Sequence, residues 1–292
     1  MLVIKAFISS FQELQTNLSD FTSIFQQTDG KFRTSRHLPV FFWLHNSRSE
    51  QTVTSHSHHS IFTELNPIER IDSLKKDGFA LGINLPLDIV REIFSLTRSF
   101  PCYGDRKNDR SFYYSEKEDA QTKYGEVFTH GIYGESAFYS PVIQKIENDP
   151  KLLEIVTQYL GTDSFRKKTQ LWWKFAEESN LYERRRAAQM FYNNWNGSRG
   201  VTFFFYLTDV NLCSSPHVCI RGSHIKKKLS HLFLRRGCTY QQITQYYGYQ
   251  NIVPICGKAG FGFVADTRCL QKANPPGSKD RLVLQIEFTV RD

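Results

Sequence analysis

The sequence lacks long apolar runs and paired-cysteine motifs. Nowhere do about 18 apolar residues follow one another, so we expect no membrane-spanning segment. The N-terminal MLVIKAFISSF carries Lys5 inside its apolar run and has no small-residue cleavage site after it, which argues against a secretory signal. The six cysteines form no C-x-x-C pair and no disulfide-framework spacing. This pattern suits a reducing compartment, and we expect a cytoplasmic protein.

The chain has no long run of charge of one sign. The 37 Lys and Arg residues are interspersed with 29 Asp and Glu residues, which leaves a net charge of +8. Three short basic runs, at 166–168, 184–186 and 226–228, fit either a phosphate-contacting face or a solvated surface. We favour the solvated surface and therefore expect no nucleic-acid partner. No pattern in the sequence bears on oligomeric state.

The composition and the changes along the chain predict one main domain with an N-terminal appendage. A chain of 292 residues that is 40% hydrophobic can bury a substantial core. Apolar residues at helical spacing between 11 and 25 predict an amphipathic helix in an N-terminal extension, 1–44. Residues 45–60 are polar, contain a His-rich stretch and indicate a linker. The main domain is predicted to cover 61–292.

Within the main domain, helical patterns come first and strand patterns follow. Helices are expected to end at Gly78, to follow Pro86 and Pro141, and to end at Gly161. Short β-branched or aromatic segments bounded by turn residues predict strands at 170–175, 200–207, 217–220, 252–255, 262–266 and 281–289. The order of the elements predicts an α+β fold whose jelly-roll core covers about 161–292.

Four ordered motifs carry a resemblance to a known family. They are LTDV at 207–210, PHVCIRGSH at 216–224, DTRCLQK at 266–272 and RLVLQIEF at 281–288. Together they resemble the phytanoyl-CoA dioxygenase-like family of non-haem Fe(II), 2-oxoglutarate-dependent oxygenases. The resemblance covers roughly 65–292 and implies a double-stranded β-helix, a jelly roll related to that of the cupins.

The family holds iron with an H-x-D pair and a later histidine, and it grips 2-oxoglutarate with an arginine. The resemblance places the H-x-D at Tyr192 and Asn194, because A-Q-x-F-H-x-D corresponds here to 188–194. It places the third histidine at Gln271. All three iron ligands are therefore replaced, whereas Arg281 stands at the position of the carboxylate-binding arginine.

These replacements change the chemistry that we expect. Amide side chains are neutral, and a tyrosine stays protonated near neutral pH, so the set is a poor host for Fe(II). We expect no Fe(II) and no other firm cofactor, with 2-oxoglutarate as a candidate ligand of Arg281. The favoured function is a degenerate, anion-binding pseudoenzyme. The candidate ligand-binding residues are Arg281, Asn194, Gln271, Trp172 and Gln189, and the candidate catalytic residue is Tyr192.

Alternatives to this interpretation remain open at this level. Cys269 lies two residues before Gln271, and His217 and Cys219 alternate on a predicted strand, so these residues are candidates for a rebuilt metal site in an active oxygenase with non-standard ligands. A metal-free enzyme with Tyr192 as general acid is another. Arg281 can instead be explained as the ion-pair partner of Asp280 or Asp209.

Overall fold

The computed structural model describes residues 59–105, 107–134, 139–176, 190–193, 198–214, 216–227, 238–273 and 279–290. The amphipathic helix expected in the N-terminal extension lies outside these residues, as does nearly all of the expected linker. The site candidates Gln189 and Asn194 also lie outside them. The fold described below is therefore that of the main domain.

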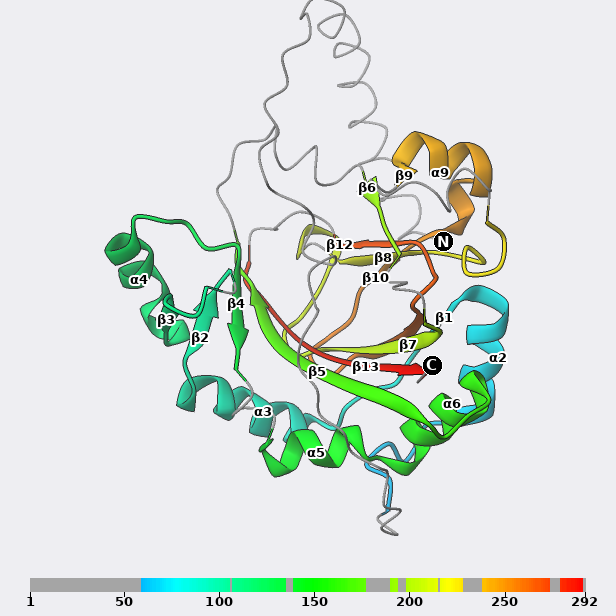
Figure 1. Cartoon of the computed structure of the whole chain (residues 1–292), viewed down its shortest axis with the longest axis horizontal. Helices are drawn as coiled ribbons and strands as arrows, with labels where there is room; N and C mark the ends of the chain where they lie inside the picture. The colour runs from blue at the N-terminus through cyan, green and yellow to red at the C-terminus, as the bar shows by residue number, and fades with distance from the viewer. Residues whose placement is uncertain are drawn as a thin grey trace, which may run out of the picture. The chain divides into compact units, whose positions relative to one another are not determined.

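An eight-stranded antiparallel sheet, the large sheet, forms the centre of this domain (Figure 1). Its β-branched and aromatic composition favours extended backbone, and the middle strand β7 is buried along its whole length. Both faces of the sheet must therefore be covered. In spatial order the strands are β1 (Phe79–Leu81), β11 (Gly262–Asp266), β7 (Gly200–Tyr206), β13 (Arg281–Val290), β5 (Phe165–Lys174), β4 (His130–Tyr133), β2 (Cys102–Gly104) and β3 (Ser111–Phe112).

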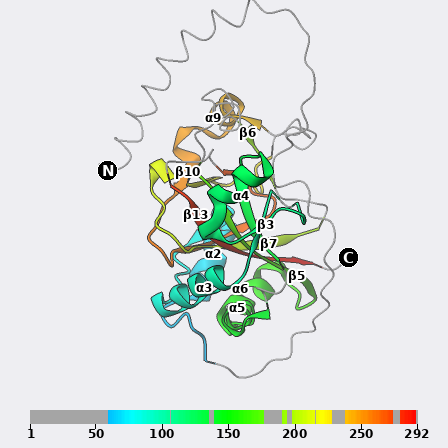
Figure 2. The ribbon, with the colours of Figure 1, turned by 90° about the vertical axis from the view of Figure 1, so that its left-hand side faces the viewer.

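Helices cover one face of the large sheet (Figures 1 and 2). Leu282, Leu284 and Ile286 of β13 alternate toward this side and join a core built with apolar residues of the helices. Gly78 ends the first helix with a φ of 85°, a conformation that glycine adopts without strain. The helical elements among the described residues are α2 (Pro67–Asp77), α3 (Leu87–Ser99), η2 (Tyr114–Glu116), α4 (Lys117–Tyr124), α5 (Pro141–Glu147), α6 (Pro150–Leu160), η4 (Leu212–Ser214), α9 (Tyr240–Tyr247) and η5 (Tyr249–Asn251).

A second, smaller sheet covers the opposite face. It has the order β10–β8–β12, and the pair β6–β9 adjoins it through a bridge between Tyr192 and Gln271. A separate apolar cluster joins the two sheets and includes Phe204, Phe263 and Cys219. The bounds are β6 (Met190–Phe191), β8 (His217–Ile220), β9 (Cys238–Thr239), β10 (Ile252–Ile255) and β12 (Gln271–Ala273). The two facing sheets make the jelly roll.

The α+β class and the jelly roll expected from the sequence are confirmed. Four short strands from before residue 161 also join the large sheet, with β1 pairing to β11. This pairing needs Gly262, because a Cβ there would lie 2.1 Å from the backbone oxygen of Ile83. Helices α4 and α9 were not anticipated. No helix in the described part of the chain is long and apolar enough to cross a bilayer.

Asp149 fastens the start of the domain to helix α6. Its carboxylate, 2% exposed, accepts hydrogen bonds from Ser60 Oγ at 2.9 Å, from the Ile61 amide at 2.8 Å and from the Lys151 amide at 2.9 Å. It therefore acts both as the helix N-cap and as an anchor for the incoming chain.

We predict that Asp149→Ala lowers the free energy of unfolding by about 2 to 3 kcal/mol, because a cap and several hydrogen bonds to a charged group are lost. Chemical denaturation measures this change. The control Asp163→Ala, at an exposed position, should change stability by less than about 0.5 kcal/mol. Equal effects of the two substitutions would contradict the anchoring role.

Candidate functional site

The space between the two sheets receives every second side chain of the central strands. Tyr206 of β7, Val283 of β13 and Trp172 of β5 lie opposite one another in the register and belong to the apolar cluster between the sheets. By the same alternation Arg281 of β13 faces this interior, two residues before Val283. Two of the predicted ligand-binding residues, Trp172 and Arg281, therefore lie on one face of the large sheet.

Two of the predicted iron-ligand positions are also neighbours. The Tyr192 amide donates to the Gln271 carbonyl at 2.8 Å, and the Gln271 amide donates to the Tyr192 carbonyl at 2.7 Å. Residues bridged in this way project to the same side. Gln271 in turn lies opposite Cys219 of β8, which is buried in the cluster between the sheets. Positions 192 and 271 therefore both face the interior.

The side chain of Gln271 is hydrogen-bonded to a histidine and does not point a free amide oxygen at a metal site. Its Oε1 lies 2.7 Å from Nε2 of His217, and both residues are almost fully buried. Burial lowers the pKa of His217 from 6.5 to about 4, so the imidazole is neutral at physiological pH. It then donates from Nε2 to the amide oxygen. Nε2 of Gln271 has no hydrogen-bond partner among the described residues.

Tyr206 connects this pair to Arg281. Its hydroxyl donates to the Ile255 carbonyl at 2.9 Å and accepts from the His217 amide at 3.1 Å. The guanidinium carbon of Arg281 lies 5.7 Å from the Tyr206 ring centroid and 5.9 Å from that of Trp172. Arg281 is only 3% exposed, and this burial lowers its pKa. A continuous set of contacts thus runs from Gln271 to Trp172.

The two carboxylates considered as partners of Arg281 bind other groups. Asp280 accepts from Lys117 at 3.0 Å and from the Ala176 amide at 2.6 Å. Asp209 pairs with Lys258 at 2.8 Å on the surface. These two carboxylates therefore do not explain the place of Arg281 in the interior.

The donor set does not fit Fe(II). In the part of the chain that the structure describes, no group of three His, Cys, Asp or Glu side chains is placed to hold a metal ion. His217 is engaged with Gln271, and burial and the neighbouring Cys269 raise the pKa of Cys219 well above its ordinary value. Cys219 is thus a thiol, a poor metal ligand. We therefore derive no chemistry through iron at this site.

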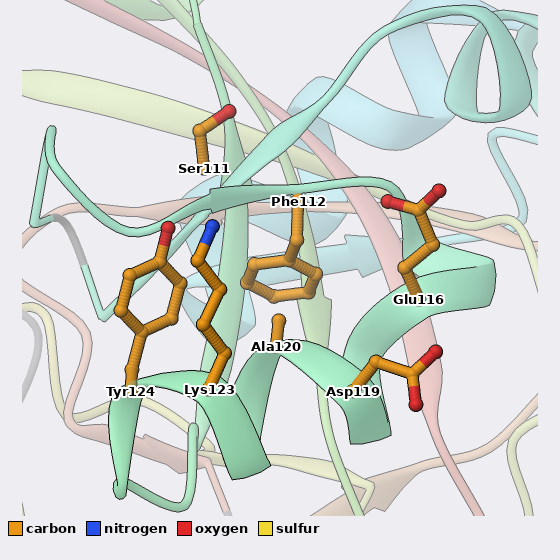
Figure 3. Close-up of a pocket in the computed structure, with 7 residues that line it drawn as sticks. All are labelled: Ser111, Phe112, Glu116, Asp119, Ala120, Lys123 and Tyr124. Atoms are coloured by element: carbon orange, nitrogen blue, oxygen red, sulfur yellow. The ribbon is translucent and has the colours of Figure 1, made fainter.

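A surface pocket elsewhere contains none of the predicted site residues. It lies between β3 and α4, with Phe112 and Ala120 at its base (Figure 3). Figure 3 shows the carboxylates of Glu116 and Asp119 on one side and Lys123 on the other. Its lining mixes both signs of charge and has no link to the contacts around Gln271, so we place the candidate site in the jelly-roll interior.

Comparison with solved structures gives the fold a context. No protein-family model matches the sequence, and no curated protein sequence matches it. The non-haem α-ketoglutarate-dependent carbocyclase SnoK from nogalamycin biosynthesis superposes with a TM-score of 0.52 at 12% identity, over 81% of this chain and 88% of that one. The two chains therefore share a fold. At this identity the likeness concerns the fold alone.

Two further solved structures superpose less well. AviO1 from Streptomyces viridochromogenes Tue57 has a TM-score of 0.49 at 12% identity, over 77% of this chain and 95% of that one. EvdO2 from Micromonospora carbonacea var. aurantiaca, complexed with 2-oxoglutarate, also has a TM-score of 0.49 at 12% identity, over 80% and 94%.

Some residues of the site were not singled out from the sequence. Tyr206 precedes the LTDV motif and looks like one more core aromatic, although its hydroxyl joins the sheets. Lys174 lies two residues after Trp172, so the two-residue repeat of a strand could have predicted that their side chains share a face. His130 comes from β4, a strand of four residues for which the sequence analysis predicts no strand. Nothing in its local sequence indicates that it lies opposite Lys174.

The neutral state of His217 predicts a pH dependence of stability. Its folded pKa lies below its unfolded value, so the unfolded state binds more protons below about pH 6.5 and stability falls as the pH drops from 6.5 toward 4. Between about pH 7.5 and pH 5 this contribution is about 2 kcal/mol.

We therefore predict that His217→Asn flattens the decline in unfolding free energy over this range by about that amount. Denaturation at several pH values measures it. The matched control His59→Asn, which replaces an exposed histidine, should retain the slope of the wild type. A wild-type slope in His217→Asn would show that His217 is not held neutral by burial.

Proposed function

We propose that this protein is an iron-free, phytanoyl-CoA dioxygenase-like member of the 2-oxoglutarate oxygenase superfamily that binds an anionic small molecule inside its jelly roll. The observation that carries the proposal is the 2.7 Å hydrogen bond between Gln271 and His217 at a position where the resemblance expects an iron ligand. The same interior keeps Arg281, so anion binding is retained where metal binding is not.

The neutral groups favour a pseudoenzyme over an oxygenase. Fe(II) in this superfamily needs two imidazoles and a carboxylate, whereas the corresponding side chains here are a phenol and two amides. An amide oxygen that already accepts from an imidazole has little to offer a cation. The loss of even one outer-sphere partner typically weakens metal binding by ~10 to 100-fold, and here the ligands themselves are replaced.

Arg281 is the natural partner for the charged end of the ligand. A guanidinium matches a carboxylate with two parallel hydrogen bonds, and its burial strengthens that attraction. Trp172 and Tyr206 present their rings to it and hold its plane. Gln271 and the neutral His217, on the small sheet, suit an uncharged polar group elsewhere on the ligand. Because SnoK is described as α-ketoglutarate-dependent, 2-oxoglutarate is the first probe.

We predict that 2-oxoglutarate binds to the purified protein in the presence of EDTA, and that Arg281→Leu weakens binding at least ~30-fold because a charge-assisted contact in a buried site is lost. Isothermal titration calorimetry measures both. Arg166→Leu, at an exposed position of β5, is the control and should bind like the wild type.

The same preparation should release no succinate from 2-oxoglutarate when Fe(II) and ascorbate are added. Stoichiometric iron in the purified protein, or succinate release that disappears in Arg281→Leu, would overturn the iron-free proposal in favour of an active oxygenase.

Restoring the expected ligands tests the lineage directly. The triple variant Tyr192→His, Asn194→Asp, Gln271→His should bind Co(II) at least ~100-fold more tightly than the wild type, because positions 192 and 271 face the same side. Calorimetry and visible absorption of Co(II) report the change. The single variant Tyr192→His is the control. A folded triple variant that gains no affinity would show that these positions do not descend from an iron triad.

A further inference from the structure

A row of basic residues crosses the large sheet beside Arg281. In the register Arg281 of β13 lies opposite Lys174 of β5, and Lys174 lies opposite His130 of β4. Residues directly opposite in antiparallel strands share a face, with Cβ atoms about 5 Å apart. The adjacent row contains Val283 and Trp172. The basic row therefore lies at the edge of the aromatic interior.

The positive charge of Lys174 affects the same interior space as the positive charge of Arg281. His217 lies on β8, across the space between the sheets, and the charges of both Arg281 and Lys174 lower its pKa, although burial is the larger cause. Trp172, on the same strand and face as Lys174, packs into the cluster between the sheets. Two full positive charges therefore face the small sheet from neighbouring strands.

His130 stands at the outer end of the row in a fixed orientation. Its Nδ1 lies 2.7 Å from Thr129 Oγ1 and 3.7 Å from Asp105 Oδ1. Asp105 also accepts from the His130 backbone amide at 2.9 Å. The centroid of the imidazole ring lies 5.7 Å from the ring centroid of Trp172. Asp105 thus interacts with His130, which lies on the far side of Lys174 from Arg281.

Arg281 and Lys174 together offer more hydrogen-bond donors and more positive charge than one carboxylate requires. A carboxylate has two oxygens, and a single guanidinium fork satisfies both of them. A phosphate monoester has three terminal oxygens and a charge of about −1.5 to −2 at neutral pH. A guanidinium and an ammonium on adjacent strands match that geometry and that charge, with lysine acting as a point charge on the third oxygen.

We infer that the ligand of this site carries a phosphate monoester group, held jointly by Arg281 and Lys174. The inference rests on the proposed function, since it specifies which anion the jelly-roll interior takes. Trp172 packs beside the cationic side chains that hold the phosphate. His217 and Gln271 contact an uncharged part of the same ligand.

The test compares two probes of equal length that differ at one end, succinate and 2-phosphoglycolate. Calorimetry at constant ionic strength and neutral pH should show that the wild-type protein binds 2-phosphoglycolate at least ~10-fold more tightly than succinate. Lys174→Met should weaken 2-phosphoglycolate at least ~10-fold and succinate less than ~3-fold. Inorganic phosphate should compete with 2-phosphoglycolate for the wild-type protein.

Lys168→Met is the matched control, because Lys168 lies on the same strand and face but opposite Glu287. It should leave both affinities within ~2-fold of the wild type. Equal wild-type affinity for the two probes, or equal losses in Lys174→Met and Lys168→Met, overturns the phosphate inference. In that case succinate binding that depends on Arg281 leaves the proposed function standing. No binding of either probe by folded protein overturns both.

Discussion

The hydroxyl of Tyr206 joins the two sheets of the jelly roll, and the candidate site is built around it. It donates to the Ile255 carbonyl on β10 and accepts from the His217 amide on β8, so one side chain of the large sheet sets the distance to the small sheet. A buried tyrosine needs such partners because an unsatisfied hydroxyl is costly in an apolar interior. The ring of the same tyrosine faces Arg281. Sheet packing and placement of the cation are therefore coupled.

The interior separates charged groups from neutral ones. On the large sheet Arg281 and Lys174 supply positive charge, and on the small sheet Gln271 and His217 supply uncharged donors and acceptors. The positive charges help to keep His217 neutral, because protonation would add another cation to a desolvated space. An environment of this kind disfavours a divalent cation and favours an anion. The proposed loss of the iron ligands and the proposed anion-binding role of Arg281 thus agree electrostatically.

A fold of this kind holds a site without dictating its chemistry. The likeness to SnoK concerns the arrangement of strands and helices, at 12% identity. What this chain does depends on the side chains that it places between the sheets. The imidazole of His217 and the amide oxygen of Gln271 are hydrogen-bonded to each other. The basic row across β13, β5 and β4 adds a feature that no motif in the sequence describes.

The sequence by itself determined the α+β class, the jelly roll, most strand positions and the helix ends at Gly78 and Gly161, because period, turn residues and caps are local properties. The resemblance was enough to single out Tyr192, Gln271 and Arg281, and Trp172 was a further candidate. Strands distant in the chain bring these residues together, Tyr192 beside Gln271 and Arg281 beside Trp172. The tertiary structure alone decided that His217 binds Gln271 and that His130 lies opposite Lys174. Both contacts arise from pairing between strands far apart in sequence, and such registers leave no local signal.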